Sequence, residues 1–180
     1  MTWPRALPWI ALLLAAGLLL GGLPLPAWLR GGDGDLTPGG TATAQVERVV
    51  DGDTIAVRLD GREERVRYIG IDTPETVKPN TPVQCWGEAA HQLNQRLLAG
   101  GDGAVTLRFD RELRDRYGRL LAYVYRGGAQ QPVAQSLNGR LLRAGAARTL
   151  TISPNTSHAA ELARLQADAR AAGRGLWGAC

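Results

Sequence analysis

Carboxylates gather in two short segments of this 180-residue sequence, Asp51-Gly52-Asp53-Thr54 and Asp72-Thr73-Pro74-Glu75. Residues i and i+2 of a strand project from one face, so we expect Asp51 and Asp53 to be neighbours. Like charges this close need a cation or an arginine between them. Oxygen ligands of this kind suit a hard cation such as Ca²⁺. Each motif alone is also an ordinary turn or Pro-stiffened loop, so neither establishes a site by itself.

Charge is divided unevenly along the chain. Residues 45–75 carry five Arg against eight acidic residues, a net charge of −3, whereas residues 106–148 carry nine Arg against three acidic residues, a net charge of +6. Metal-assisted phosphoester chemistry uses both an acidic and a basic segment, because carboxylates bind a metal that polarises the phosphate and guanidinium groups stabilise the developing charge. The segment Asp115-Arg116-Tyr117-Gly118-Arg119 offers such groups, although alone it is typical of a solvated turn. Arginine makes up 20 of the 21 basic residues, which favours phosphate binding or else reflects a GC-rich genome.

The elements that must position these segments lie between residues 45 and 180. Alternating or continuous apolar residues predict strands over Val46–Leu59, Glu64–Ile71, Val105–Phe109 and Leu120–Tyr125, with Asp60-Gly61 as a hairpin turn. Helical spacing predicts helices ending at Gly100, Gly145 and Gly173, the second starting near Ser136 and the third capped by Ser157. We read the order as three strands, a helix, two strands and two helices, five strands in all, of which the ranges above delimit four. This order indicates a closed or nearly closed barrel with helices outside.

Three motifs in this order and spacing resemble the thermonuclease, or staphylococcal-nuclease-like, family. They are Asp-Gly-Asp-Thr, then Arg67 five residues before Asp-Thr-Pro-Glu-Thr, and then Asp-x-Tyr-Gly-Arg before a Leu-Ala-Tyr strand. The resemblance covers about Val46 to Trp177. It implies an α+β fold, a five-stranded OB-fold barrel with three helices.

The resemblance also implies a reaction and a set of site residues. Ca²⁺-dependent hydrolysis of DNA or RNA would cut the 5′ P–O bond and leave 3′-phosphate ends, which makes the protein a nuclease. The implied roles are catalytic for Arg67, Glu75 and Arg119, metal-binding for Asp53, Asp72 and the Thr73 carbonyl, and phosphate-binding for Tyr117. Asp51 would lie next to the metal ligands without binding the ion directly. The rival class is a non-catalytic OB-fold binding module, which has no need for both arginines, the glutamate and the metal carboxylates together.

Simple alternation does not bring Arg67 and Asp72 together. These residues are five apart, so a regular strand would aim them at opposite faces. We therefore expect a bend or bulge around Gly70 that turns Asp72 back toward Arg67. The chain also departs from the family pattern at Thr151 and Ser153, where the best-known member has two tyrosines near the nucleobase. We expect weaker substrate binding and an altered base preference from that change.

Two cysteines, Cys85 and Cys180, are the only pair available for a disulfide. In an exported protein we expect them to pair, with two free thiols as the alternative. A bridge would hold the C-terminal residue against the segment before the first helix.

The N-terminal residues read as a segment separate from the fold. Residues 6–29 are uncharged and long enough to cross a bilayer, so residues 1–30 are a transmembrane anchor or a cleaved signal peptide. Residues 31–44 read as a flexible linker before the domain at 45–180. Both alternatives export the domain, which is then membrane-anchored outside the cytoplasm or is secreted or periplasmic; we expect a monomer. With 44% apolar residues the chain is not disordered, and its net charge of +4 is too ordinary to indicate a nucleic-acid binder by itself.

Overall fold

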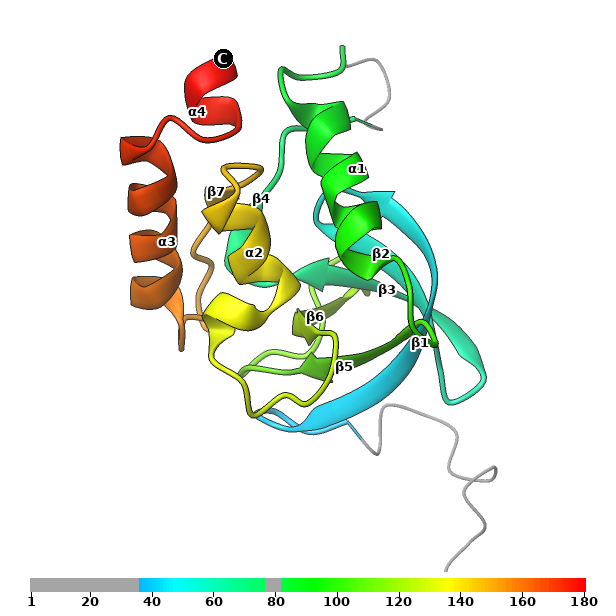
Figure 1. The fold of residues 1–180 in the computed structure, drawn as a ribbon. Helices are drawn as coiled ribbons and strands as arrows, with labels where there is room; N and C mark the ends of the chain where they lie inside the picture. The colour runs from blue at the N-terminus through cyan, green and yellow to red at the C-terminus, as the bar shows by residue number, and fades with distance from the viewer. Residues whose placement is uncertain (1–35, 77–81) are drawn as a thin grey trace, which may run out of the picture. The chain divides into compact units, whose positions relative to one another are not determined.

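A five-stranded β-barrel forms the centre of the protein. The computed structural model describes residues 36–76 and 82–180 (Figure 1). The barrel closes in the order β1-β2-β3-β6-β5, which confirms the barrel prediction. Its strands are β1 (Thr41–Asp51), β2 (Thr54–Leu59), β3 (Arg62–Tyr68), β5 (Ala104–Arg108) and β6 (Leu120–Tyr125). Neighbouring strands are antiparallel except β3 and β6, which are parallel.

A second, two-stranded sheet joins β4 (Ile71–Asp72) to β7 (Arg148–Thr149). Its register places Asp72 opposite Arg148, and the Leu150 N–H donates to the Gly70 carbonyl next to it. This small sheet fixes the segment that carries the second carboxylate motif.

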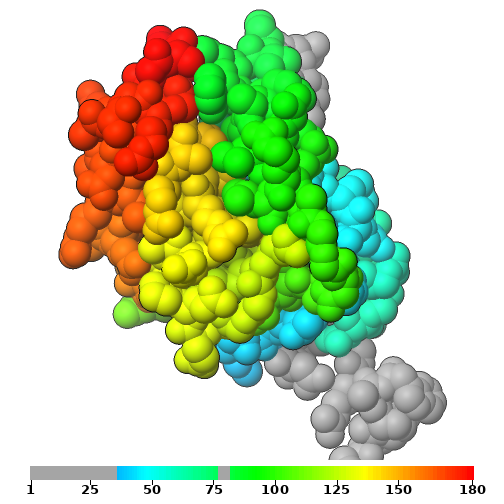
Figure 2. All heavy atoms as spheres, in the orientation of Figure 1, coloured from blue at the N-terminus to red at the C-terminus, as the bar shows by residue number. Residues whose placement is uncertain are grey.

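Helices cover one side of the barrel. They are α1 (Gly87–Leu98), α2 (Leu137–Arg143), α3 (Ala159–Ala171) and the short α4 (Leu176–Ala179), with a 3₁₀ turn at Val133–Gln135. In the space-filling view, α2 lies between α1 and the C-terminal helices (Figure 2). The three longer helices confirm the prediction, and α4 is an addition to it. Among the described residues, no helix is long and apolar enough to span a membrane.

The core lies inside the barrel and under α2. Ile55, Val57, Val66, Leu107 and Leu120 are completely buried there. Leu137, Leu141 and Leu142 of α2 pack on the same cluster. The Ser136 side chain accepts a hydrogen bond from the Gly139 N–H, so α2 starts where the sequence predicts.

Three sequence predictions are wrong in detail. The range Val46–Leu59 is two strands, because the chain turns back at Gly52-Asp53 between Asp51 and Thr54. Thr41–Ala44, assigned to the linker, pair with β5 at the start of β1. Ser157 does not cap α3; its hydroxyl donates to Asp110, and His158 occupies the cap position. Residues 36–40 of the predicted linker lie outside strands and helices and include a turn closed by the Gly40 N–H and the Thr37 carbonyl. Residues 31–35 and the predicted N-terminal anchor or signal lie outside the described residues.

Candidate active site

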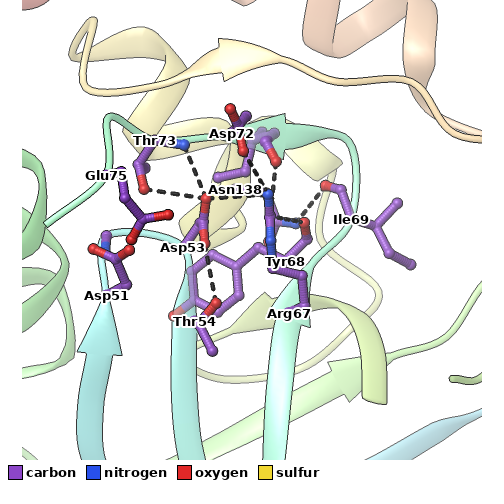
Figure 3. Close-up of polar contacts among 12 residues, drawn as sticks. Asp51, Asp53, Thr54, Arg67, Tyr68, Ile69, Asp72, Thr73, Glu75 and Asn138 are labelled. Atoms are coloured by element: carbon purple, nitrogen blue, oxygen red, sulfur yellow. Dashed lines mark hydrogen bonds and ion pairs between the residues drawn. The ribbon is translucent and has the colours of Figure 1, made fainter. Parts of the chain in front are cut away.

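Asp53 ties the turn between β1 and β2 to the loop after β4. Its side chain is buried, and one oxygen, Oδ2, accepts hydrogen bonds from the Thr73 N–H (2.8 Å) and the Thr73 hydroxyl (3.1 Å). The other oxygen accepts from Thr54 Oγ1 at 3.0 Å. Asp51 and Asp53 therefore meet across a tight turn and not along one strand, but both side chains still face the second motif (Figure 3).

Gly70 makes the bend that the sequence requires. Strand β3 ends at Tyr68, Gly70 adopts φ +79°, and the chain resumes as β4. A Cβ on Gly70 would lie 2.4 Å from Leu162 Cδ1, so glycine is needed for space as well as for backbone conformation. The predicted bend is confirmed.

This bend places Arg67 between two carboxylates. Its Nη2 lies 2.8 Å from Asp72 Oδ1 and 3.2 Å from Asp53 Oδ2. Its Nη1 donates to the Ile71 carbonyl at 2.7 Å and to the Tyr68 carbonyl at 2.9 Å. The guanidinium is therefore held on both edges, and it is the cation that keeps the two carboxylates together (Figure 3).

Glu75 and Asp51 lie on the other side of Asp53. The Asp51 Oδ1 accepts from the Gly52 N–H at 2.8 Å and from Thr76 Oγ1 at 2.7 Å, which binds the end of β1 to the residue after Glu75. Figure 3 shows the Glu75 carboxylate next to that of Asp51, with Asp53 between them and Arg67. Asn94 of α1, fully buried, donates to the Asp51 carbonyl at 3.4 Å and so connects the first helix to this side of the site.

The electrostatics of this group favour an added cation. Partial burial raises the pKa of Asp72, and the nearby Asp53 and Asp51 raise it further, while Arg67 and Arg148 act in the opposite direction. When the charged form of a carboxyl is disfavoured in this way, a bound metal ion stabilises that form. Among residues 36–76 and 82–180, no three His, Cys, Asp or Glu side chains are grouped as a complete metal-binding set. The predicted Ca²⁺ site needs fewer such side chains, because its protein ligands are two carboxylates and the Thr73 carbonyl, and water molecules complete the coordination shell.

A cleft of about 380 Å³ opens beside Arg67 and brings in the arginine-rich segment. Arg67 and Arg119 both line it, as do Asp115, Arg116 and Tyr117. Arg119 Nε donates to Asp115 Oδ2 at 2.7 Å, and Asp115 Oδ1 accepts from the N–H groups of Tyr117 and Arg119. Burial alone would raise the pKa of Asp115, but these bonds outweigh it and lower the pKa, so Asp115 stays ionised and orients Arg119.

Tyr117 lines this cleft with its side chain exposed to solvent. Its side chain is 67% exposed, and the guanidinium groups of Arg116 and Arg119 lie 4.8 and 5.4 Å from its ring centre. Its hydroxyl accepts a hydrogen bond from Arg116 at 2.7 Å. The predicted phosphate-binding tyrosine is therefore beside the second predicted arginine.

Sequence reasoning missed two residues of the cleft lining. Leu150 and Ile152 line the cleft and are 40% and 60% exposed. The structure therefore brings Leu150 and Ile152, and not the Thr151 and Ser153 between and after them, to the cleft wall. Buried Asn155 shapes the same wall, because its side chain receives the N–H groups of Arg111 and Glu112 and donates to the Glu112 carbonyl. The only sequence signal was an alternation of exposed apolar residues in a short segment after a strand.

The predicted residues thus form two groups that meet at Arg67. Arg67, Tyr117 and Arg119 line the cleft, whereas Asp53 and Asp72 bond the Arg67 guanidinium and do not line it. Thr73 bonds Asp53, and Asp51 and Glu75 lie beyond Asp53. The predicted disulfide between Cys85 and Cys180 is present in the structure.

Comparison with known proteins gives consistent matches. Residues 65–179 match the family model described as "Staphylococcal nuclease homologue". A thermonuclease of Staphylococcus intermedius is 43% identical over 132 residues, which cover 73% of this chain and 74% of that protein. A thermonuclease of Staphylococcus hyicus is 41% identical over 135 residues, 75% of each chain. Endonuclease YncB of Bacillus subtilis is 40% identical over 134 residues, 73% of this chain and 60% of that protein.

Proposed function

The chain belongs to the staphylococcal nuclease homologue family, and on that premise we propose that it is a nuclease that hydrolyses phosphodiester bonds of DNA or RNA with Ca²⁺. The observation that carries the proposal is Arg67. It bonds two carboxylates on one side and lines, with Arg119 and Tyr117, a cleft on the other. A site of this form can hold a phosphate group between arginines next to a metal-binding group.

We assign the metal to Asp53, Asp72 and the Thr73 carbonyl, with Asp51 behind them. Partial burial, and then the nearby Asp53 and Asp51, raise the pKa of Asp72, and this disfavoured charge supports the choice of ligands. When bound, Ca²⁺ would supply positive charge to the phosphate and lower the pKa of a bound water.

The protein's own groups perform three tasks in the proposed reaction. Arg67 and Arg119 donate hydrogen bonds to the non-bridging oxygens as negative charge builds up on phosphorus. Tyr117 holds the phosphate by its hydroxyl. Glu75 orients a water molecule and takes its proton as the oxygen attacks phosphorus. The P–O5′ bond then breaks, the 5′ oxygen takes a proton from solvent, and the other product keeps a 3′-phosphate.

The walls of the cleft indicate how the substrate lies. Tyr117, Leu150 and Ile152, which all line the cleft, are large side chains left exposed to solvent. Bases that are not stacked in a duplex would cover these surfaces, since aromatic and aliphatic side chains both pack on base faces. We therefore propose single-stranded or locally unpaired nucleic acid as the preferred substrate.

We also propose that the enzyme acts outside the cytoplasm. The Cys85–Cys180 disulfide supports this location, because such bonds persist in oxidising compartments. Mass measurement of the non-reduced protein from its producing cell should show no free thiol; two free thiols would contradict the export proposal. The monomeric state stays a prediction.

The central test is digestion of single-stranded DNA with Ca²⁺ or with a chelator, for the wild-type protein, Glu75→Ala and Glu88→Ala. Glu88 is an exposed carboxylate of α1 that bonds Gln92, so its variant controls for the loss of one negative charge. We expect the chelator to abolish cleavage, Glu75→Ala to lower kcat by about 10²–10⁴-fold, and Glu88→Ala to change little. Cleavage that survives both the chelator and the Glu75 change would refute the mechanism.

A further inference from the structure

The backbone of Glu75 is held at two points by one residue, Gln84. The Glu75 N–H donates to Gln84 Oε1 at 3.1 Å. In the opposite direction, the Gln84 N–H donates to the Glu75 carbonyl at 3.0 Å. Both backbone polar groups of Glu75 are therefore bonded to a residue nine positions later in the chain, and one of the two bonds depends on the Gln84 side chain.

Gln84 is fixed in turn by the start of α1. Its carbonyl accepts the Gly87 N–H at 2.9 Å, which closes a turn before the helix. Gly87 is buried against the same loop, since a Cβ added there would lie 3.0 Å from the Glu75 carbonyl oxygen and 3.2 Å from that of Pro74. The glutamate loop therefore rests directly on the helix start.

The disulfide anchors this helix start to the C-terminal end of the chain. Cys85, next to Gln84, is bonded to Cys180 across 95 residues of sequence. The Cys180 N–H donates to the Leu176 carbonyl, and the Leu176 N–H donates to the Gly145 carbonyl at the end of α2. Leu176 itself is only 3% exposed. An unbroken line of covalent and hydrogen bonds therefore runs from the core through α4, the disulfide and Gln84 to Glu75.

We propose that Gln84 is a positioning residue for Glu75 and that the Cys85–Cys180 disulfide holds Gln84 in place for this task. The inference rests on the proposed function, in which Glu75 handles the attacking water. A displacement of about 1 Å at such a group lowers the rate by about 10²-fold. Gln84 does not line the cleft, so its loss should lower kcat and leave KM nearly unchanged.

A double-mutant cycle with Glu75 tests the positioning role. Gln84→Ala should lower kcat by about 10- to 100-fold in the native background and by less than about twofold in a Glu75→Gln background, because Gln84 acts through Glu75. Gln84→Glu keeps an acceptor oxygen for the Glu75 N–H and should recover most of the activity. Gln92→Ala, which removes another exposed glutamine bonded within the same helix region, is the matched control and should leave kcat unchanged.

Equal losses of kcat in both backgrounds would overturn the positioning role and indicate a general effect on the fold. Full activity of Gln84→Ala would overturn it directly. Failure of the proposed function gives a different result, namely that Glu75→Gln by itself retains wild-type kcat.

The disulfide is tested with Cys85→Ser/Cys180→Ser, alone and combined with Gln84→Ala. Activity is measured at a temperature where circular dichroism shows each variant folded. We expect the serine pair to lower kcat by about tenfold and to add little to Gln84→Ala, since both act through the same contact. A serine pair that is folded and fully active would overturn the anchoring role. Should the pair not fold, non-denaturing reduction of the wild-type protein supplies the same comparison, with full kcat after reduction as the contradicting result.

Discussion

Replacing Gly70 by alanine should separate two reasons for glycine at the bend that joins Arg67 to Asp72. The first is the backbone, because φ is +79° and a left-handed conformation costs an L residue about 1–2 kcal/mol. The second is space, because the new Cβ would lie 2.4 Å from Leu162 Cδ1. Leu162 is 1% exposed and cannot turn away into solvent. Such overpacking costs about 1–3 kcal/mol, so Gly70→Ala should lower the free energy of unfolding by about 2–5 kcal/mol in all.

The chain contains a matched control for the backbone term. Gly61, in the turn between β2 and β3, has φ +80° but no atom within 4 Å of an added Cβ. Gly61→Ala should therefore lose only the backbone part, and any gain from a stiffer unfolded chain is the same in both variants. Urea unfolding followed by circular dichroism measures both values.

A third variant isolates the contact. Leu162→Ala removes the crowded atom, so the cost of Gly70→Ala should fall in that background to about the value for Gly61→Ala. Nuclease activity should follow the bend: Gly70→Ala should lower kcat, because Arg67 and Asp72 meet only when the chain turns there, while Gly61→Ala should not. Equal stability losses for Gly70→Ala and Gly61→Ala would refute the steric part of this reasoning.

Three further outcomes are expected. Burial, and then the nearby Arg108, lower the pKa of His158 from 6.5, so the unfolded chain binds the proton more readily than the folded one. The free energy of unfolding should therefore fall as the pH drops below 6.5, and His158→Gln should remove this dependence on pH. Urea midpoints between about pH 5 and 8 that do not change with this substitution would contradict the prediction. Asn138→Ala should lower the free energy of unfolding in urea by about 3 kcal/mol or more, because the buried amide bonds the Val124 N–H and the carbonyls of Ile69 and Ala122. A loss below about 1 kcal/mol would mean that these three backbone groups find other partners. Leu150→Tyr/Ile152→Tyr, at two residues that line the cleft, should lower KM for single-stranded DNA by an amount that corresponds to about 1–3 kcal/mol per stacked base. The same change at Thr151 and Ser153, which do not line it, should leave KM nearly unchanged; an unchanged KM in both variants would show that bases do not bind here.

Local patterns were enough to predict most of the elements and to propose a set of site residues. Strand β6 follows from a continuous apolar run, α2 follows from Ser136 and Gly145, and the site follows from three motifs whose order and spacing the family shares. The bend at Gly70 was also deducible, because Arg67 and Asp72 cannot share a face of a regular strand. Each of these inferences uses residues near one another in sequence, where backbone geometry dictates the outcome.

Other features depend on neighbours that are distant in the chain. Ser157 looked like a helix cap, but Asp110, 47 residues earlier, takes its hydroxyl. Thr41–Ala44 have the composition of a linker and become a strand because β5 offers them a partner. A local pattern predicts what a segment can do, and the competing partner that decides between the possibilities is not visible in it.

The sequence by itself therefore determined which residues we propose for the chemistry, namely the carboxylates, the arginines and the glutamate, and which two cysteines form the disulfide. Only the tertiary structure decided their arrangement. It placed Arg67 between Asp53 and Asp72, brought Leu150 and Ile152 into one cleft with Tyr117, and connected the disulfide through Gln84 to Glu75. The physical reason is that residue type fixes which bonds a side chain can form, whereas closure of the barrel and packing of the helices fix which partners come within their reach of about 3 Å.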